Sequence, residues 1–275
     1  MWLSLFKIEY DDFEVDESYK SYLHSMACQF AVNLYESYSD WAPQQIIGTE
    51  TQAGSDVWFA ERRFRVTASI CKRVMRLGEN LDRRQCYFWL EQSFWFKRKF
   101  TSQDMQYGIN EERNAIAAYS QVTGNEVHQS GLWVRKGYIY LAATPDGLLL
   151  DSFRRVRGIV EVKCLKALRT KTVQEWIKSG VPTNACVRVS NGRLELKMGH
   201  SYFFQIQLQL LMTQAYFCDF VLYSKVGPPS IERVYSNVDV QKRIIYGVKK
   251  FWYQDFLPEY FLMRVPRHLL PIIFE

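Results

Sequence analysis

The stretch LAATPDGLLL, residues 141–150, places a single carboxylate, Asp146, inside an apolar run. Pro145 and Gly147 on either side of it both favour a turn or a bend. Taken alone, Pro-Asp-Gly is typical of an ordinary hairpin turn, and a tripeptide is too short to exclude that interpretation. A second short run, GIVEVKC at residues 158–164, follows it and changes the balance.

Glu161 and Lys163 belong to this second run, and their spacing of two residues matters. Successive side chains of a strand point to opposite faces, so Glu161 and Lys163 share one face, while Val160 and Val162 share the other. A neighbouring strand that carries Asp146 would bring two carboxylates and one lysine together. One interpretation is a surface salt bridge across two strands, which contributes little. The apolar flanks of both runs instead indicate a buried sheet, where a single lysine cannot neutralise two acids.

A divalent cation would balance these charges. The carboxylates of Asp146 and Glu161 and the carbonyl of Val162 are hard oxygen ligands, which Mg²⁺ prefers, with Mn²⁺ as a substitute. Lys163 would then orient a metal-bound water, lower its pKa or stabilise the developing charge. Asp, then Glu-x-Lys on the next strand, is the pattern of the PD-(D/E)xK nucleases, and Pro145 supplies the proline. We therefore expect an α/β (α+β) fold with a restriction-endonuclease-like core, in which helices flank a central mixed β-sheet.

The rest of the chain fits a mixed architecture. Helices are expected at residues 17–38, 82–99, 103–123 and 201–216, the third ending at a C-cap, Gly124. Another helix is expected to begin after a cap at Thr67 or Ser69. A last helix is expected from a cap at Asp239 toward Pro258. Strands are expected at 126–134, 138–144, 158–164, 218–225 and 231–236, with an Asn-Gly hairpin at 186–197.

The charge is unevenly distributed along the 275 residues. Residues 1–56 hold ten acidic residues against two lysines, a net charge of −8, which leaves +14 for the remainder. Basic residues concentrate at 62–84 and again at 154–171. Such clusters, interleaved with aromatic residues, favour a polyanionic partner. The shift in charge divides the chain into an acidic, mainly helical N-terminal extension, 1–56, and a domain at 57–275.

The composition, with 48% hydrophobic residues, is that of a folded globular chain. The six cysteines form no CxxC pair, so free thiols are expected. The chain shows neither a signal peptide nor a stretch of about 20 apolar residues that would cross a membrane. A soluble intracellular protein is expected, in the nucleus if the source is eukaryotic.

Four blocks in order resemble the phage lambda exonuclease family, also called YqaJ-type viral recombinases. They are WFAERRFRVTAS (58–69), GINEERNAIAAYSQVTG (108–124), the pair LAATPDGLL and GIVEVKC, and SYFFQIQLQL (201–210). The long segment between Cys164 and Gln205 looks more like the mobile-element and viral members from eukaryotes than the phage enzyme. Residues 57–275 would then be the nuclease domain.

The resemblance implies a role for each matching residue. Arg62, assisted by Ser69, would hold a 5′-terminal phosphate, and an arginine fork suits that task. Glu112 would complete the metal and water shell, Thr144 would contact phosphate, and Gln205 would hold the scissile or terminal phosphate. Without the resemblance, each would be interpreted as an ordinary polar residue of a helix or turn.

The implied activity is that of a Mg²⁺-dependent exonuclease that degrades double-stranded DNA from free ends, 5′ to 3′, in recombination, repair or viral and mobile-element DNA processing. A single-strand annealing protein and further copies of the chain would be its partners, and no membrane is involved. Two alternatives stay open: a structure-specific endonuclease that uses the same site, and a non-catalytic DNA-binding recombination partner. The intact set of Asp146, Glu161 and Lys163 favours catalysis.

Overall fold

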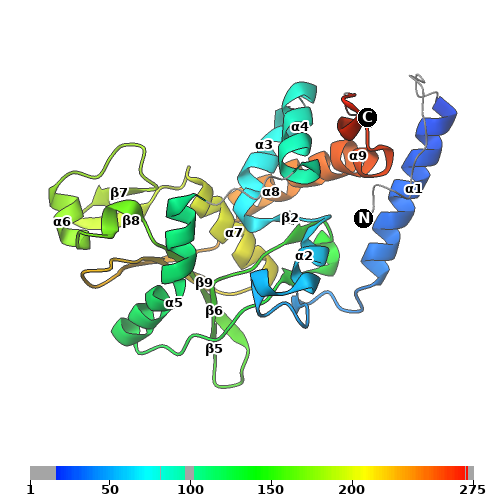
Figure 1. Cartoon of the computed structure of the whole chain (residues 1–275). Helices are drawn as coiled ribbons and strands as arrows, with labels where there is room; N and C mark the ends of the chain where they lie inside the picture. The colour runs from blue at the N-terminus through cyan, green and yellow to red at the C-terminus, as the bar shows by residue number, and fades with distance from the viewer. Residues whose placement is uncertain (1–16, 81, 97–101, 270, 272–275) are drawn as a thin grey trace.

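A four-stranded mixed sheet lies at the centre of the molecule (Figure 1). The computed structural model covers the chain, and it describes residues 17–80, 82–96, 102–269 and 271. The strands are β5 (Gly147–Leu150), β6 (Val156–Lys163), β9 (Phe217–Leu222) and β10 (Ser230–Tyr235), in the order β10-β9-β6-β5. Strand β6 runs parallel to β9 and antiparallel to β5, and β10 runs antiparallel to β9. The predicted mixed sheet is confirmed.

Two helices cover opposite faces of this sheet. Val160 and Val162 pack with Ala115 and Tyr119 of α5 (Gln103–Thr123), which ends at the left-handed Gly124. Side chains of the other face pack toward α7 (Ser201–Thr213), where the rings of Tyr202 and Phe220 lie 6.4 Å apart. The alternation along β6 therefore separates an apolar face from the face that carries Glu161, as predicted.

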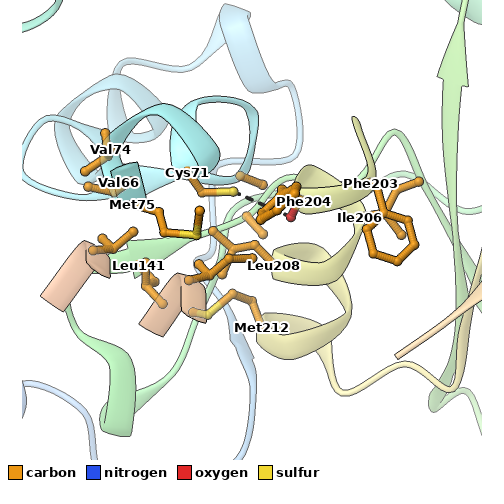
Figure 2. Packing of buried hydrophobic residues seen from close by; sticks show 14 of the residues in the cluster. Val66, Cys71, Val74, Met75, Leu141, Phe203, Phe204, Ile206, Leu208 and Met212 are labelled. Atoms are coloured by element: carbon orange, nitrogen blue, oxygen red, sulfur yellow. Dashed lines mark hydrogen bonds between the residues drawn. The ribbon is translucent and has the colours of Figure 1, made fainter. Parts of the chain in front are cut away.

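A second helical layer packs on α7. Helix α3 (Cys71–Asn80) contacts α7, and Figure 2 shows Cys71 donating a hydrogen bond to the carbonyl of Phe204 at 3.5 Å. Helix α8 (Val238–Phe251) crosses α3 very closely at two glycines. A Cβ atom built on Gly78 would lie 1.9 Å from the carbonyl oxygen of Gly247. The crossing thus depends on the absence of side chains at both positions.

Helix α1 (Glu17–Glu36) packs against α9 (Leu257–Leu262) at one side of the molecule (Figure 1). The ring of Phe30 lies 5.8 Å from the rings of both Phe64 and Tyr260. The predicted division of the chain at residue 56 stays a prediction, and residues 1–16 of the predicted extension lie outside the described residues.

Shorter elements complete the chain. The remaining α-helices are α2 (Asp56–Arg62), α4 (Arg83–Trp89) and α6 (Val173–Lys178). Strand β1 (Gln44–Gln45) pairs with β3 (Trp133–Val134), and β2 (Val66–Thr67) pairs with β4 (Leu141–Ala142). The predicted Asn-Gly hairpin is confirmed as β7 (Val187–Ser190) and β8 (Arg193–Leu196), with positive φ at both Asn191 and Gly192.

Several predicted elements differ from the observed ones. The run 126–134 forms a strand only at Trp133–Val134, with an isolated bridge from His128 to Leu148. Residues 82–96 begin as α4, capped by Asp82, and widen into the π-helix Leu90–Trp95; residues 97–99 lie outside the described part. The helix predicted at 201–216 ends at Thr213, because Gln214 adopts a left-handed conformation.

The predicted C-cap at Gly124 is confirmed, whereas the predicted caps at helix N-termini were wrong. Asn237, not Asp239, caps α8, because its side chain accepts a hydrogen bond from the backbone N–H of Val240. Helix α8 ends at Phe251 and a π-helix, Trp252–Phe256, separates it from α9. Before α3 the chain makes a 3-10 turn, Ala68–Ile70, and the side chain of Thr67 makes no capping hydrogen bond there.

The six cysteines are free, as predicted. Within the described ranges, the helices are too short or too polar to cross a membrane.

Candidate active site

Glu161 is a fully buried carboxylate near the end of β6. Its Oε1 accepts hydrogen bonds from Lys163 Nζ and from Gln205 Nε2 (2.5 Å), and its Oε2 accepts one from Gln209 Nε2 at 2.6 Å. An ionised carboxylate is stable in a protein interior only when it is paired and hydrogen-bonded. One ammonium and two amides from α7 provide these partners.

Asp146 lies beside Glu161, directly before β5. Its backbone N–H donates to the carbonyl of Val160 at 3.1 Å, and its Oδ2 accepts from the N–H of Val162 at 2.8 Å. Asp146 is therefore not the turn of the hairpin. The β5–β6 turn lies at residues 151–155, where Asp151 Oδ1 accepts from the N–H groups of Phe153 and Arg155. The hairpin interpretation of Pro-Asp-Gly was wrong, but the predicted bend is present, because the backbone bends at Asp146 directly before β5.

The acids of the site make one another harder to ionise. Desolvation and then the negative charge of Glu161 raise the pKa of Asp146 well above its ordinary value, although Lys163 opposes this shift. The pKa of Glu112 on α5 is also raised, first by burial and then by Glu161. Like charges at short range resist ionisation together.

The two adjacent acids of α5 have different environments. Glu111 forms an ion pair with Lys225 at 3.1 Å and accepts a hydrogen bond from Asn114 at 2.9 Å, so both of its carboxylate oxygens already have partners. Glu112 instead lies close enough to Glu161 and Lys163 for their charges to influence it. The structure thus brings Glu112, and not its neighbour, to the carboxylate pair.

Lys163 carries the positive charge of the site. Its ammonium group lies 4.7 Å from the ring centroid of Tyr202, in cation–π geometry. Desolvation alone would lower the pKa of Lys163, but the charges of Glu161 and Asp146 raise it overall. At neutral pH Lys163 is therefore a protonated donor, suited to contacting anionic oxygens and not to accepting a proton.

A divalent cation fits this donor set. Val162 directs its N–H toward Asp146, and the N–H and C=O of a strand residue point to the same side, so its carbonyl faces that side as well. No cluster of three or more His, Cys, Asp and Glu side chains in metal-binding proximity occurs in the described part of the chain. Mg²⁺ does not need one, because it binds through one or two carboxylates and keeps several waters.

Arg62 approaches the same region from α2. Its guanidinium lies 3.5 Å from the ring centroid of Trp58, whose Nε1 donates to Thr144 Oγ1 at 3.1 Å, two residues before Asp146. Burial lowers the pKa of Arg62 to about 10, so it stays charged at neutral pH. No carboxylate pairs with Arg62 within the described residues, which leaves its charge available to an anion.

The neighbouring Arg65 has a different environment. Its buried guanidinium pairs with Glu61 at 2.6 Å, donates to the carbonyl of Ile139 at 3.1 Å and contacts Tyr38. Of these two arginines, only Arg62 is placed to bind a phosphate near Asp146.

Ser69 and Gln205, both predicted to contact phosphate, do not lie beside Arg62 in a ready-made phosphate pocket. Ser69 is exposed in the 3-10 turn before α3, and no contact joins it to Arg62 in the part of the chain that is described. The amide of Gln205 donates to Glu161. Their roles toward phosphate stay predictions.

Sequence reasoning missed Gln209. This glutamine is fully buried, and its Nε2 contacts both Glu161 and, at 3.4 Å, the carbonyl of Thr144. A signal was present, because residues four apart on a helix lie on one face, and Gln209 follows Gln205 at that spacing in a mostly apolar helix.

A buried network on the opposite face of the sheet was also missed. Asp219 of β9 accepts from Tyr119 Oη at 2.6 Å and pairs with both Nε and Nη2 of Arg233, at 2.8 and 2.9 Å. It ties α5, which carries Glu112, to the strands beside β6.

Known proteins share the family signature and the fold of this chain. The model of the YqaJ-like viral recombinase domain matches residues 57–216. The chain is similar to the crystal structure of an alkaline exonuclease, LHK-Exo, from Laribacter hongkongensis, with a TM-score of 0.52 and 26% identity. That match covers 78% of this chain and 97% of the other.

The complex of LHK-Exo with dAMP matches with a TM-score of 0.52 and 25% identity, over 78% of this chain and 100% of the other. A comparison with curated proteins found no match.

Proposed function

The chain belongs to the YqaJ-like viral recombinase family, and on this premise we propose that it is a metal-dependent nuclease that degrades double-stranded DNA from its ends. One observation carries the proposal: Asp146, Glu161 and Lys163 converge at the ends of two paired strands, with the buried Glu161 held by three donors. The similarity to an alkaline exonuclease supports a hydrolase that acts on DNA.

The metal would be held by Asp146, Glu161 and the carbonyl of Val162, and Glu112 would complete the shell of metal and water. Mg²⁺, or Mn²⁺ in its place, would supply a Lewis acid and an activated water for attack on a phosphodiester. Gln205 and Gln209 hold the Glu161 carboxyl group in one orientation, since each amide donates to one of its oxygens. Lys163 donates to the phosphate oxygens as negative charge develops on them.

Recognition of the DNA end is assigned to Arg62. Its guanidinium lies on Trp58 next to Thr144 and is free to bind a terminal phosphate with two parallel hydrogen bonds. Ser69 and Thr144 add hydroxyl contacts. Binding of a 5′-phosphate there would set a 5′-to-3′ direction of degradation. A single-strand annealing protein, self-association and a nuclear location stay predictions.

Three DNA substrates test the proposal: linear duplex with a 5′-phosphate, linear duplex without it, and closed circular duplex, each in Mg²⁺ or EDTA. We expect degradation of linear DNA only, with a preference for the phosphorylated end and no cleavage in EDTA. Cleavage of circles would show an endonuclease. Binding without any cleavage would show a non-catalytic DNA-binding protein.

Two variants test the assigned residues. Lys163→Ala should bind DNA but lower the cleavage rate by about a hundredfold or more, because a donor to the transition state is lost. Arg62→Ala should lose the preference for phosphorylated ends, while Arg63→Ala, an exposed neighbour, is the matched control and should keep it. Full activity of Lys163→Ala would refute the site.

A further inference from the structure

A basic hollow of about 390 Å³ lies beside the candidate active site. Helices α3 and α4, the 3-10 turn before α3 and the first residue of α7 form it, and Figure 1 shows α3 and α4 in the upper part of the molecule. Its lining residues are Ser69, Lys72, Arg73, Arg76, Leu77, Gln85, Phe88 and Ser201. These residues come from three separate segments of the chain, so only the tertiary structure assembles the hollow.

All the charged residues that line the basic hollow are positive. Lys72, Arg73 and Arg76 line it, and its lining contains no acidic residue. Desolvation lowers the pKa of Lys72, and the nearby charge of Arg76 lowers it further. Arg73 and Arg76 are exposed and form no ion pair with the described residues. A bound anion would relieve this repulsion.

Phe88 adds an aromatic surface to the same hollow. Its side chain is 53% exposed, although phenylalanine is normally buried. Bases of single-stranded nucleic acids stack on such rings, and the positive groove beside them tracks the phosphates. A ring and several cations in one hollow therefore match one nucleotide, with its base and its phosphate.

The basic hollow is next to the catalytic lysine. Ser201, in its lining, precedes Tyr202, over whose ring the Lys163 ammonium lies at 4.7 Å. Lys72 donates a hydrogen bond to the carbonyl of Gly199, which ties α3 to the same loop. A strand that passes Lys163 can thus continue into the basic hollow.

We propose that the basic hollow binds a nucleotide of an unpaired DNA strand, with its base stacked on Phe88 and its phosphate held by Arg73 and Arg76. The proposal rests on the function proposed above, because DNA is the substrate in both. A base inside a duplex stacks on its neighbours and cannot present its face to a protein ring without unpairing, so the basic hollow selects single-stranded DNA.

The test measures binding of the full-length protein to fluorescent oligothymidylate in EDTA, by anisotropy. A second oligonucleotide of the same length has abasic sites in place of the thymines. We expect the wild type to bind the thymine strand roughly tenfold more tightly, and Phe88→Ala to bind both strands equally, since only base stacking is lost. Phe153→Ala, which removes another exposed phenylalanine from the β5–β6 turn, is the matched control and should keep the difference.

Arg76→Ala tests the phosphate contact. This substitution should weaken the binding of both strands by the same factor. It should also make the slope of the logarithm of the association constant against the logarithm of the salt concentration shallower by about one, as expected for the loss of one phosphate contact. If Phe88→Ala still prefers the thymine strand as the wild type does, or if the wild type shows no preference, the proposal is wrong.

Cleavage of linear duplex in Mg²⁺ is measured separately. A wild type that discriminates through Phe88 but cleaves nothing would refute the nuclease and retain the basic hollow. A wild type that cleaves linear duplex but binds the thymine and abasic strands equally would support the nuclease and refute the proposed role of the basic hollow.

Discussion

Glu259 gives the chain a pH-dependent stability that can be measured directly. This residue of α9 is fully buried, and its Oε1 accepts hydrogen bonds from Trp95 Nε1 at 2.9 Å and from the N–H of Val265 at 2.8 Å. Burial raises the pKa of Glu259 from 4.5 to about 7, although these donors act in the opposite direction. The folded protein therefore keeps a proton that the unfolded chain releases between pH 4.5 and 7.

The sign follows from linkage. Stability from the protonated form is fully present below pH 4.5 and is lost as the pH rises through about 7. A shift of this size corresponds to about 3 kcal/mol, since each pKa unit is about 1.4 kcal/mol. Glu259→Gln keeps an oxygen for Trp95 and Val265 but cannot ionise. Relative to the wild type, its free energy of unfolding should rise by about 2–3 kcal/mol between pH 5 and pH 9.

Urea denaturation at pH 5, 7 and 9, followed by tryptophan fluorescence, measures this difference. Any packing cost of the amide cancels, because only the change with pH is compared. Glu126→Gln removes a carboxylate with an 83% exposed side chain and is the control, for which we expect no comparable change. A difference between Glu259→Gln and the wild type that stays constant from pH 5 to pH 9 would refute the reasoning.

Two further substitutions test the packing and the site. Gly78→Ala should lower the free energy of unfolding by about 3 kcal/mol or more, because its Cβ would meet the carbonyl of Gly247 at 1.9 Å; Gly108→Ala, a helical glycine with open space around it, should raise it by about 1 kcal/mol. Urea midpoints measure both, and equal effects would contradict the close crossing. Gln209→Leu leaves Glu161 Oε2 without its amide donor and should lower kcat for linear duplex about tenfold with little change in KM. A change in KM alone would assign Gln209 to DNA binding.

The local pattern of the chain predicted much of the candidate site. The spacing of Glu161 and Lys163 was enough to place them on one face of a strand, because alternation depends only on backbone geometry. The apolar flanks were enough to predict a buried sheet, and Asp146 does lie beside that strand. Caps and helix ends were harder to predict, since Asn237 and Asp239 both suit a cap, and one backbone conformation decided between them.

Local spacing was enough to predict that two acids and a lysine meet on a buried mixed sheet, and that the basic residues are clustered. The packing of the chain was needed to show which of several chemically equal side chains is available at the candidate site. Arg62 is available and Arg65 is not, because the guanidinium of Arg65 donates to the carbonyl of Ile139 and contacts Tyr38, both distant in sequence. The basic hollow likewise depends on the packing of α3, α4 and α7. Alternation and charge are local properties of the chain, whereas a hydrogen-bond partner that is distant in sequence is set by how the layers pack.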